Sequence, residues 1–221
     1  IVLDAYGEAL ARHGLIGTDH RWRVEHWSAA RADQFRRAVE LGVMTPLAVY
    51  QFMYLGDLAD GTLFPPEIGS QWVAAADALA AGSLISFHSD SPVAPVNPLL
   101  DVQCMATRRT PTGGLHGANQ AISVHEAFKA HTTSAAYHLR REHDLGSITV
   151  GKLADFVELS ADPYSVDIEQ LTDHVKVLGT WSGGRKIDLD AFMSDIDKID
   201  PAQHKALTQH VAMTSGPGSA S

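Results

Sequence analysis

Hydrophobic positions along the first two thirds of the chain alternate between helical and strand-like spacing. Apolar residues recur every three or four positions over residues 1–14, which predicts an opening helix with Gly14 at its C-terminal cap. Further helices are predicted at residues 31–41, 67–81, 99–108 and 124–141, the last with Ser123 as its N-cap. Short apolar runs between them predict strands at residues 22–26, 43–50 and 84–87. This alternation predicts an α/β fold with a parallel sheet and right-handed crossovers.

The pattern changes near Gly146, where strand-like segments follow one another without helices of similar length. Residues 146–159 predict two short strands around a Gly-Lys turn, and residues 175–181 and 185–187 predict two more, joined by Ser182-Gly183-Gly184. We therefore expect an α/β region over residues 1–143, a small β unit over 144–190 and a C-terminal extension over 191–221. In the extension we expect one helix at residues 201–213 and a disordered end.

Three strand–helix units are too few to close an eight-stranded barrel, which needs about 250 residues. Either the sheet is open, or the chain forms part of a larger barrel. The opening helix has no start signal in the sequence and no methionine before it, so we expect further residues upstream of residue 1.

Charge and cysteine content narrow the classes of partner. The net charge of −9 argues against nucleic acid or an anionic membrane surface, because both require a basic patch. It says little about a small-molecule substrate, which is the expected partner. The single cysteine, Cys104, can form no disulfide within the chain, which favours a cytoplasmic location. We expect its side chain in the core. No apolar run reaches the length of a transmembrane helix.

The segment that follows the predicted strand 84–87 carries the most informative candidate. A short apolar run leads into His88-Ser89-Asp90, and Pro92 follows, as when a buried parallel strand delivers a carboxylate to the rim of an α/β barrel. A carboxylate held there can bind a metal, accept a proton from water, or do both. Alternatively, Asp90 only begins a turn. His88 can be a further metal ligand, a hydrogen-bond donor behind the ligands, or part of the core.

His26 ends the predicted strand 22–26 and can present a neutral nitrogen to a metal, or it can simply be a hydrogen-bonded structural histidine. Regular alternation would place Trp22, Val24 and His26 on one face of that strand, and Arg23 and Glu25 on the other.

Other polar residues favour structural roles. Four histidines are expected in structural or surface positions, namely His116, His125, His131 and His138. Arg108 and Arg109 end a predicted helix, where one could meet an anionic substrate or interact with the helix end. Residues 56–66 form the expected lid loop, since they are rich in glycine, aspartate and proline.

Taken in order, the motifs resemble the YtcJ-like group of amidohydrolase family 3, within the amidohydrolase superfamily. The matching segments are Arg21-Trp22-Arg23-Val24-Glu25-His26, Ser89-Asp90-Ser91-Pro92-Val93, Asn97-Pro98, Glu126-Ala127 with Thr132 and Ala135-Ala136, Gly146-Ser147-Ile148, Gly151-Lys152, Ala154-Asp155 and Asp162-Pro163. Each motif is weak alone, and their order and spacing over residues 1 to about 190 make the resemblance specific.

The resemblance implies the C-terminal part of a (β/α)₈ barrel, about strands six to eight, with part of a small β-sandwich. It implies one or two divalent metal ions, usually zinc, with iron or manganese as alternatives. His26 and Asp90 would be metal ligands, with His88 as an additional candidate, and Asp90 would also shuttle the proton. The implied reaction is hydrolysis of a non-peptide carbon–nitrogen bond of amide or cyclic amide type. A non-catalytic subunit, a metal-dependent decarboxylase and an oxygenase are the alternatives, and a homo-oligomer is a further expectation.

The chain also departs from the family pattern. The family's ligands on strands one, four and five would precede residue 1. His88 stands where glycine is usual, and Tyr50-Gln51-Phe52 occupies the region of a Gln-Pro pair. Because two ligands do not make a tight metal site, we expect the chain to need the N-terminal half of the barrel, on the same longer protein or on a separate chain.

Overall fold

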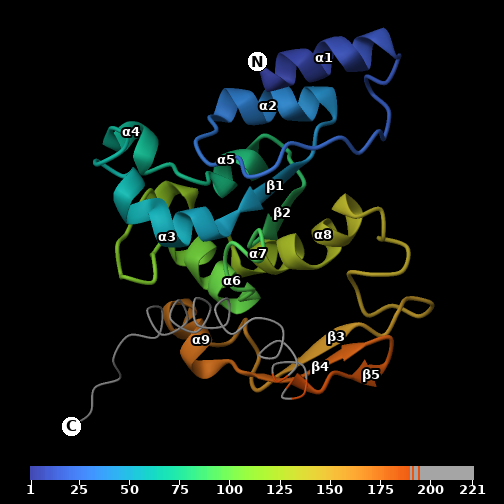
Figure 1. Cartoon of the computed structure of the whole chain (residues 1–221). Helices are drawn as coiled ribbons and strands as arrows, with labels where there is room; N and C mark the ends of the chain where they lie inside the picture. Colours follow the sequence, from blue (N-terminus) through green and yellow to red (C-terminus); the bar gives the residue numbers. More distant parts are fainter. Residues whose placement is uncertain (190, 192–193, 195–221) are drawn as a thin grey trace.

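Two parallel strands lie at the centre of the computed structural model, which describes residues 1–189, 191 and 194 (Figure 1). Strand β1 (Thr45–Ala48) pairs in parallel with β2 (Ile85–His88), with Thr45 opposite Ile85 and Ala48 opposite His88. The segment that ends at His26 joins the other edge of β1 through parallel bridges from Arg23 to Met44 and from His26 to Leu47. The strand order therefore follows the sequence, and all three carboxyl ends meet at one edge of the sheet.

Helices α1 (Val2–Arg12) and α2 (Ala32–Leu41) lie side by side on one side of these strands (Figure 1). Helix α2 buries Phe35, Ala38 and Leu41, which are spaced at one turn, and Gly42 ends it in the left-handed conformation at φ 71°. Helix α1 ends at Arg12, and Gly14 follows its cap at φ 65°, as the sequence predicted.

The remaining helices surround the strands. They are α3 (Val49–Ala59), α4 (Pro66–Gly69), α5 (Ala75–Ala80), α6 (Pro98–Thr107), α7 (Val124–His131), α8 (Thr133–His138) and α9 (Leu171–His174), with 3₁₀ turns η1 (Ala118–Gln120) and η2 (Ile168–Gln170). The predicted helix at 99–108 is confirmed by α6, and the Ser123 cap is confirmed by its side chain, which accepts a hydrogen bond from the Glu126 amide at 3.1 Å. Cys104 on α6 is buried, as expected.

Two long helices predicted from sequence are wrong in extent. The predicted helix at 67–81 is split into α4 and α5, with Val73 between them at φ 55°. Carbonyl groups in this gap accept hydrogen bonds from the buried guanidinium of Arg108, at 3.2 Å for Ser70, 2.8 Å for Trp72 and 3.1 Å for Val73. The backbone therefore satisfies its acceptors with a distant side chain instead of a continuous helix.

The predicted helix at 124–141 breaks at Thr132, whose φ of −121° and ψ of −94° are not helical. The Thr132 hydroxyl donates to the Phe128 carbonyl at 2.7 Å, which occupies an acceptor in the last turn of α7. The predicted strand at 43–50 is also shorter, because α3 begins at Val49 and extends to Ala59. Helix α3 therefore takes up the start of the expected lid loop at 56–66.

The small β unit is a three-stranded antiparallel sheet in the order β3 (Phe156–Leu159), β4 (Val177–Ser182), β5 (Arg185–Lys186). Gly183 and Gly184, both with positive φ, form the predicted turn between β4 and β5. The first predicted strand near residue 146 is wrong, because Gly146 and Gly151 adopt positive φ and the backbone forms turns there. The expected helix at 201–213 and the expected disordered end lie outside the described residues.

Most large apolar side chains form one core around the strand segments, including Leu10, Phe35, Leu47, Phe52 and Met105. Among the described residues, no helix combines the length and the hydropathy needed to cross a lipid bilayer.

Candidate metal centre

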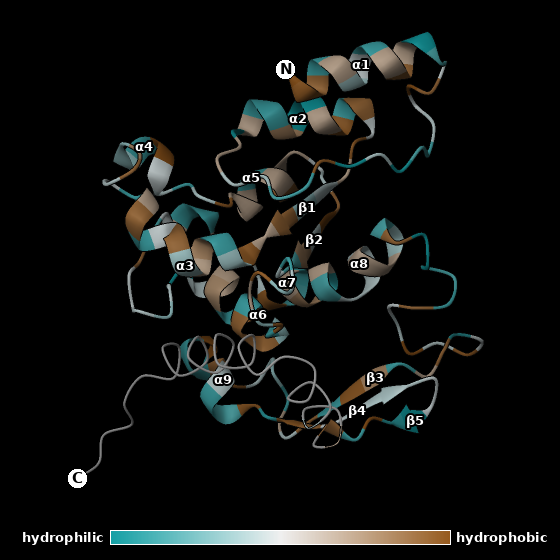
Figure 2. Cartoon of the chain, viewed as in Figure 1, coloured by the Kyte–Doolittle hydropathy of each residue, from teal (hydrophilic) through white to brown (hydrophobic). Residues whose placement is uncertain are grey.

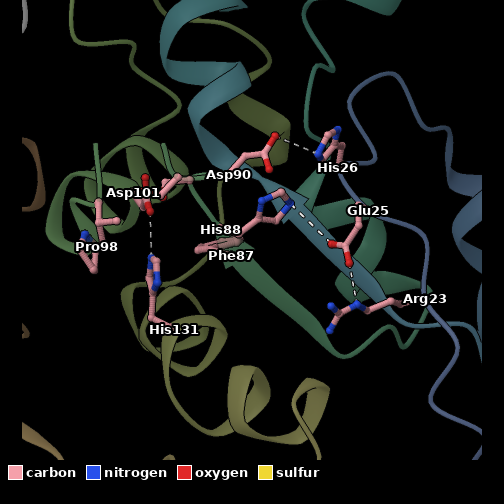
Figure 3. A pocket seen from close by; sticks show the side chains of 12 residues that line it. Arg23, Glu25, His26, Phe87, His88, Asp90, Pro98, Asp101 and His131 are labelled. Carbon is pink, nitrogen blue, oxygen red and sulfur yellow. Dashed lines mark ion pairs between the residues drawn. The ribbon is translucent and has the colours of Figure 1, made fainter. Parts of the chain in front are cut away.

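His26, His88 and Asp90 come together at the carboxyl ends of the parallel strands (Figure 3). One potential ligand atom from each lies within 4.8 Å of those of the other two. His26 Nε2 is 3.5 Å from Asp90 Oδ2, and the two imidazole rings have centroids 5.2 Å apart. The structure thus brings together all three residues that the sequence marked as candidate ligands.

The backbone positions two of these residues by an uncommon conformation. His26 and Asp90 have φ values of 78° and 53°, in the left-handed region that L-residues other than glycine rarely adopt. Such a conformation costs roughly 1–3 kcal/mol per residue and persists where the surrounding structure holds it, often at functional sites. It also changes the direction of the backbone at His26 and just after β2, where the two side chains come together.

The distances suit a divalent metal. Two donor atoms bound to a tetrahedral zinc at about 2.0–2.1 Å lie about 3.3 Å apart, close to the 3.5 Å between His26 and Asp90. His88 Nε2 is buried and has no hydrogen-bond partner among the described residues; Glu25 Oε2 is 3.9 Å away. Burial lowers the pKa of His88 more than the nearby Glu25 carboxylate raises it, so the neutral imidazole that binds metals is favoured. Two imidazoles and one carboxylate form a donor set used by zinc and by iron(II).

Glu25 and Arg23 also face the site, which sequence alternation did not predict. Arg23 Nε lies 2.6 Å from Glu25 Oε1, and both residues line the same cavity as His26. The positive φ of His26 breaks the alternation of the strand, so neighbouring side chains reach one cavity instead of opposite faces. The cavity has a volume of about 520 Å³.

A second pair of ionisable side chains, Asp101 and His131, lines the same cavity. His131 Nε2 lies 3.2 Å from Asp101 Oδ2, and the His131 ring packs edge-on against Phe87 at 5.4 Å. Phe87 precedes His88 on β2, so the two side chains point to opposite faces of the strand. The cavity therefore reaches residues on both faces of β2, and the Asp101–His131 pair is separate from the three candidate ligands.

The other predicted structural histidines have structural contacts. His138 is buried, with Nδ1 2.7 Å from the Ser86 hydroxyl and Nε2 2.7 Å from the Leu84 carbonyl. His125 packs against the ring of Tyr164.

His116, in the loop between α6 and η1, contacts the C-terminal end of α3, with Asp57 at 2.7 Å and Asp60 at 2.8 Å. Burial lowers its pKa, but the hydrogen bonds to Asp60 and Asp57 outweigh burial and raise it overall.

Of the two arginines, Arg108 is fully buried and Arg109 pairs with Glu169 at 3.2 Å. Neither lines the cavity in the described part of the chain, and each side chain bonds to another segment instead of the end of its own helix.

Two curated relatives resemble this chain over most of its length, and a third over less than half. Protein LONG AFTER FAR-RED 3 of Arabidopsis thaliana is 32% identical over 197 residues, which cover 85% of this chain and 32% of that protein. N-substituted formamide deformylase of Arthrobacter pascens is 29% identical over 193 residues, which cover 83% of this chain and 33% of that protein. Putative amidohydrolase YtcJ of Bacillus subtilis (strain 168) is 34% identical over 96 residues, which cover 42% of this chain and 18% of that protein. The chain spans a third or less of the length of these relatives.

Solved structures share the fold. An uncharacterised metal-dependent hydrolase from Pyrococcus horikoshii OT3 matches 75% of this chain and 33% of its own chain, with a TM-score of 0.61 and 24% identity. An adenosine deaminase from Xanthomonas campestris, solved with bound zinc, matches 92% of this chain and 46% of its own, with a TM-score of 0.60 and 18% identity. The model of the amidohydrolase family matches residues 2–187. As the ordered motifs predicted, the chain belongs to the amidohydrolase family.

Proposed function

We propose that this chain is part of a metal-dependent hydrolase that cleaves non-peptide carbon–nitrogen bonds of amide or cyclic amide type. The observation that carries the proposal is the convergence of His26, His88 and Asp90 at the ends of the parallel strands. Membership of the amidohydrolase family supports the reaction class. The concave site favours a small-molecule substrate.

His26, His88 and Asp90 would hold a divalent metal, most simply zinc, with one or two ions bound in the complete site. Such a metal would polarise the substrate carbonyl and lower the pKa of a water molecule. Asp90 would accept the proton from the attacking water, whose oxygen bonds to the carbonyl carbon. Asp90 then returns that proton to the leaving nitrogen, so that the carbon–nitrogen bond breaks to release an amine.

We propose that the remaining barrel strands come from the same longer protein or from a separate chain. The described sheet segment would then supply about strands six to eight of a (β/α)₈ barrel. The matched segment covers only 32% and 33% of two curated relatives, which supports the expectation that further strands complete the barrel. The small β unit supports it too, because β3 shows hydrophobic residues in Figure 2 and Val157 on it is 49% exposed. An apolar surface of this kind suits further strands of a β-sandwich.

Hydrolysis by the complete protein tests the proposal. The metal-stripped protein, reloaded with Zn²⁺, should release an amino group, as a separate amine or within the opened ring, from members of a panel of N-substituted formamides, N-acyl amines and cyclic amides. Asp90→Asn should abolish that release, whereas Asp33→Asn, which changes an exposed aspartate paired with Arg31, should not. Absence of hydrolysis across the panel by wild-type protein that contains metal would favour a non-catalytic subunit.

The donor set also supports one second candidate. Two histidines and one carboxylate are the ligands of non-haem iron(II) oxygenases, so the same fold could carry oxidation or decarboxylation instead. Iron in the purified protein, together with activity that depends on Fe²⁺ and not on Zn²⁺, would favour that candidate over hydrolysis.

A further inference from the structure

A chain of hydrogen bonds connects the three strand ends beside the candidate ligands. The Ser28 hydroxyl donates to the Gln51 side-chain carbonyl, and Gln51 Nε2 donates to the Tyr50 hydroxyl at 3.1 Å. The Tyr50 hydroxyl in turn donates to Asp90 Oδ2 at 3.4 Å. We refer to Ser28, Gln51 and Tyr50 together as the tyrosine chain.

The tyrosine chain and Asp90 come from three separate segments at the sheet edge. Ser28 lies two residues after His26, at the end of the first strand segment. Tyr50 and Gln51 lie in the first turn of α3, directly after β1. Asp90 follows β2. The hydrogen bonds therefore span all three strand ends and join the segment that carries His26 to the segment that carries Asp90.

The donors and acceptors of the tyrosine chain fit only one direction. An ionised Asp90 carboxylate can only accept, so the Tyr50 hydroxyl hydrogen must point toward it. The phenolic oxygen is then left to accept from the Gln51 amide nitrogen, and the Gln51 carbonyl accepts from Ser28. This defined direction orients Tyr50 toward the same Asp90 oxygen that faces His26 at 3.5 Å.

The aromatic ring of Tyr50 reinforces this arrangement. It meets the His26 ring edge-on, with centroids 6.5 Å apart and planes 88° apart. One residue thus contacts both the carboxylate and an imidazole of the candidate centre, although Tyr50 is not itself a candidate ligand.

We propose that Tyr50 is a positioning residue that holds Asp90 against His26, and that Gln51 and Ser28 act through it. The inference rests on the proposed function, because it assigns these residues to the same metal centre. Groups that orient metal ligands by hydrogen bonds typically change metal affinity or activity 10- to 100-fold when they are removed.

The test measures the dissociation constant for Co²⁺ in the complete protein, by competition with a chromophoric chelator. Tyr50→Phe keeps the ring beside His26 and removes only the hydroxyl. We expect it to weaken Co²⁺ binding at least about tenfold and to change the visible absorption spectrum of bound Co²⁺. The melting temperature should stay within the range of the control Tyr164→Phe, whose ring packs against Phe128 outside the cavity.

A double variant tests whether Gln51 affects metal binding through Tyr50 or independently of it. Gln51→Leu should weaken Co²⁺ binding in the same direction, and Tyr50→Phe with Gln51→Leu should be no weaker than Tyr50→Phe alone, because Gln51 acts through Tyr50. Multiplicative losses would overturn the role of Gln51 in the chain.

Wild-type affinity and spectrum in Tyr50→Phe would overturn the proposal for Tyr50 and leave the metal centre intact. Absence of Co²⁺ binding by the wild-type protein would instead overturn the proposed function, and this inference with it.

Discussion

Arg108 offers a prediction whose size follows from the structure. Its guanidinium is fully buried and donates to four carbonyl groups, those of Val73, Ser70, Trp72 and His116, at 2.8 to 3.2 Å. Replacement by methionine fills much of the volume but leaves those acceptors without this donor. Each buried acceptor left unsatisfied costs about 1–3 kcal/mol.

The sum of the costs of these four carbonyl groups overstates the loss of stability for two reasons. The Val73 carbonyl keeps a second donor, the Ala75 amide at 2.9 Å, and removal of the guanidinium also removes the cost of burying a charge. That cost is visible in the pKa of Arg108, which burial lowers to about 9. We therefore expect Arg108→Met to reduce the free energy of unfolding by about 3–5 kcal/mol.

Urea unfolding followed by circular dichroism measures this change, and the adjacent arginine is the matched control. Arg109 is exposed and pairs with the exposed Glu169, so Arg109→Met should cost less than about 1 kcal/mol. Equal losses in the two variants would refute the reasoning that the buried carbonyl groups depend on Arg108.

The remaining predictions concern the reaction, the small sheet and pH. Asp90→Asn should abolish turnover while it largely spares metal binding and fold, and near-normal turnover in steady-state kinetics would contradict its role. Asp155→Ala should lower the melting temperature without loss of turnover, because its carboxylate accepts from the Gly183 amide at 2.6 Å in the β4–β5 turn; lost turnover at an unchanged melting temperature would oppose this. His116 has a raised pKa in the folded protein, so its two ion pairs stabilise fully below about pH 6.5 and less as the pH rises through the folded pKa. The difference in melting temperature between wild type and His116→Gln should therefore shrink from pH 6 to pH 9, and a difference that grows with pH would contradict the sign.

The parallel strand segments and the convergence of the three candidate residues were predictable because local signals and tertiary packing agree there. The apolar run before His88 forms β2 within one residue of its predicted start, and Asp90 follows it. The motif that ends at His26 reaches the same sheet edge because parallel strands present their carboxyl ends together. Family membership was predictable from ordered motifs, none of which is specific alone.

The misplaced boundaries arise where distant residues override local preference. Val49 and Tyr50 suit a strand, yet both begin α3, whose buried side chains, such as Phe52, pack into the core. The split of the predicted helix at 67–81 depends on Arg108, about forty residues away in sequence. The approach of Glu25 to the cavity depends on the positive φ of His26, which no hydrophobic pattern encodes.

The same limit applies to the tyrosine chain and to the Asp101–His131 pair. Tyr50 marked only a departure from a family pattern, and its bond to Asp90 crosses forty residues of sequence. His131 looked structural because its partner Asp101 lies on another helix. The departure at residues 50–52 was the available signal, but its meaning required the three-dimensional arrangement.

Metal content of the complete protein tests the central claim most directly. Elemental analysis after exhaustive dialysis should find bound divalent metal in the wild type and in the control His125→Ala. His26→Ala and Asp90→Ala should each lose most of it, and His88→Gly should retain less than the wild type. Full metal occupancy in the combined His26→Ala and Asp90→Ala variant would contradict a metal centre built on these residues.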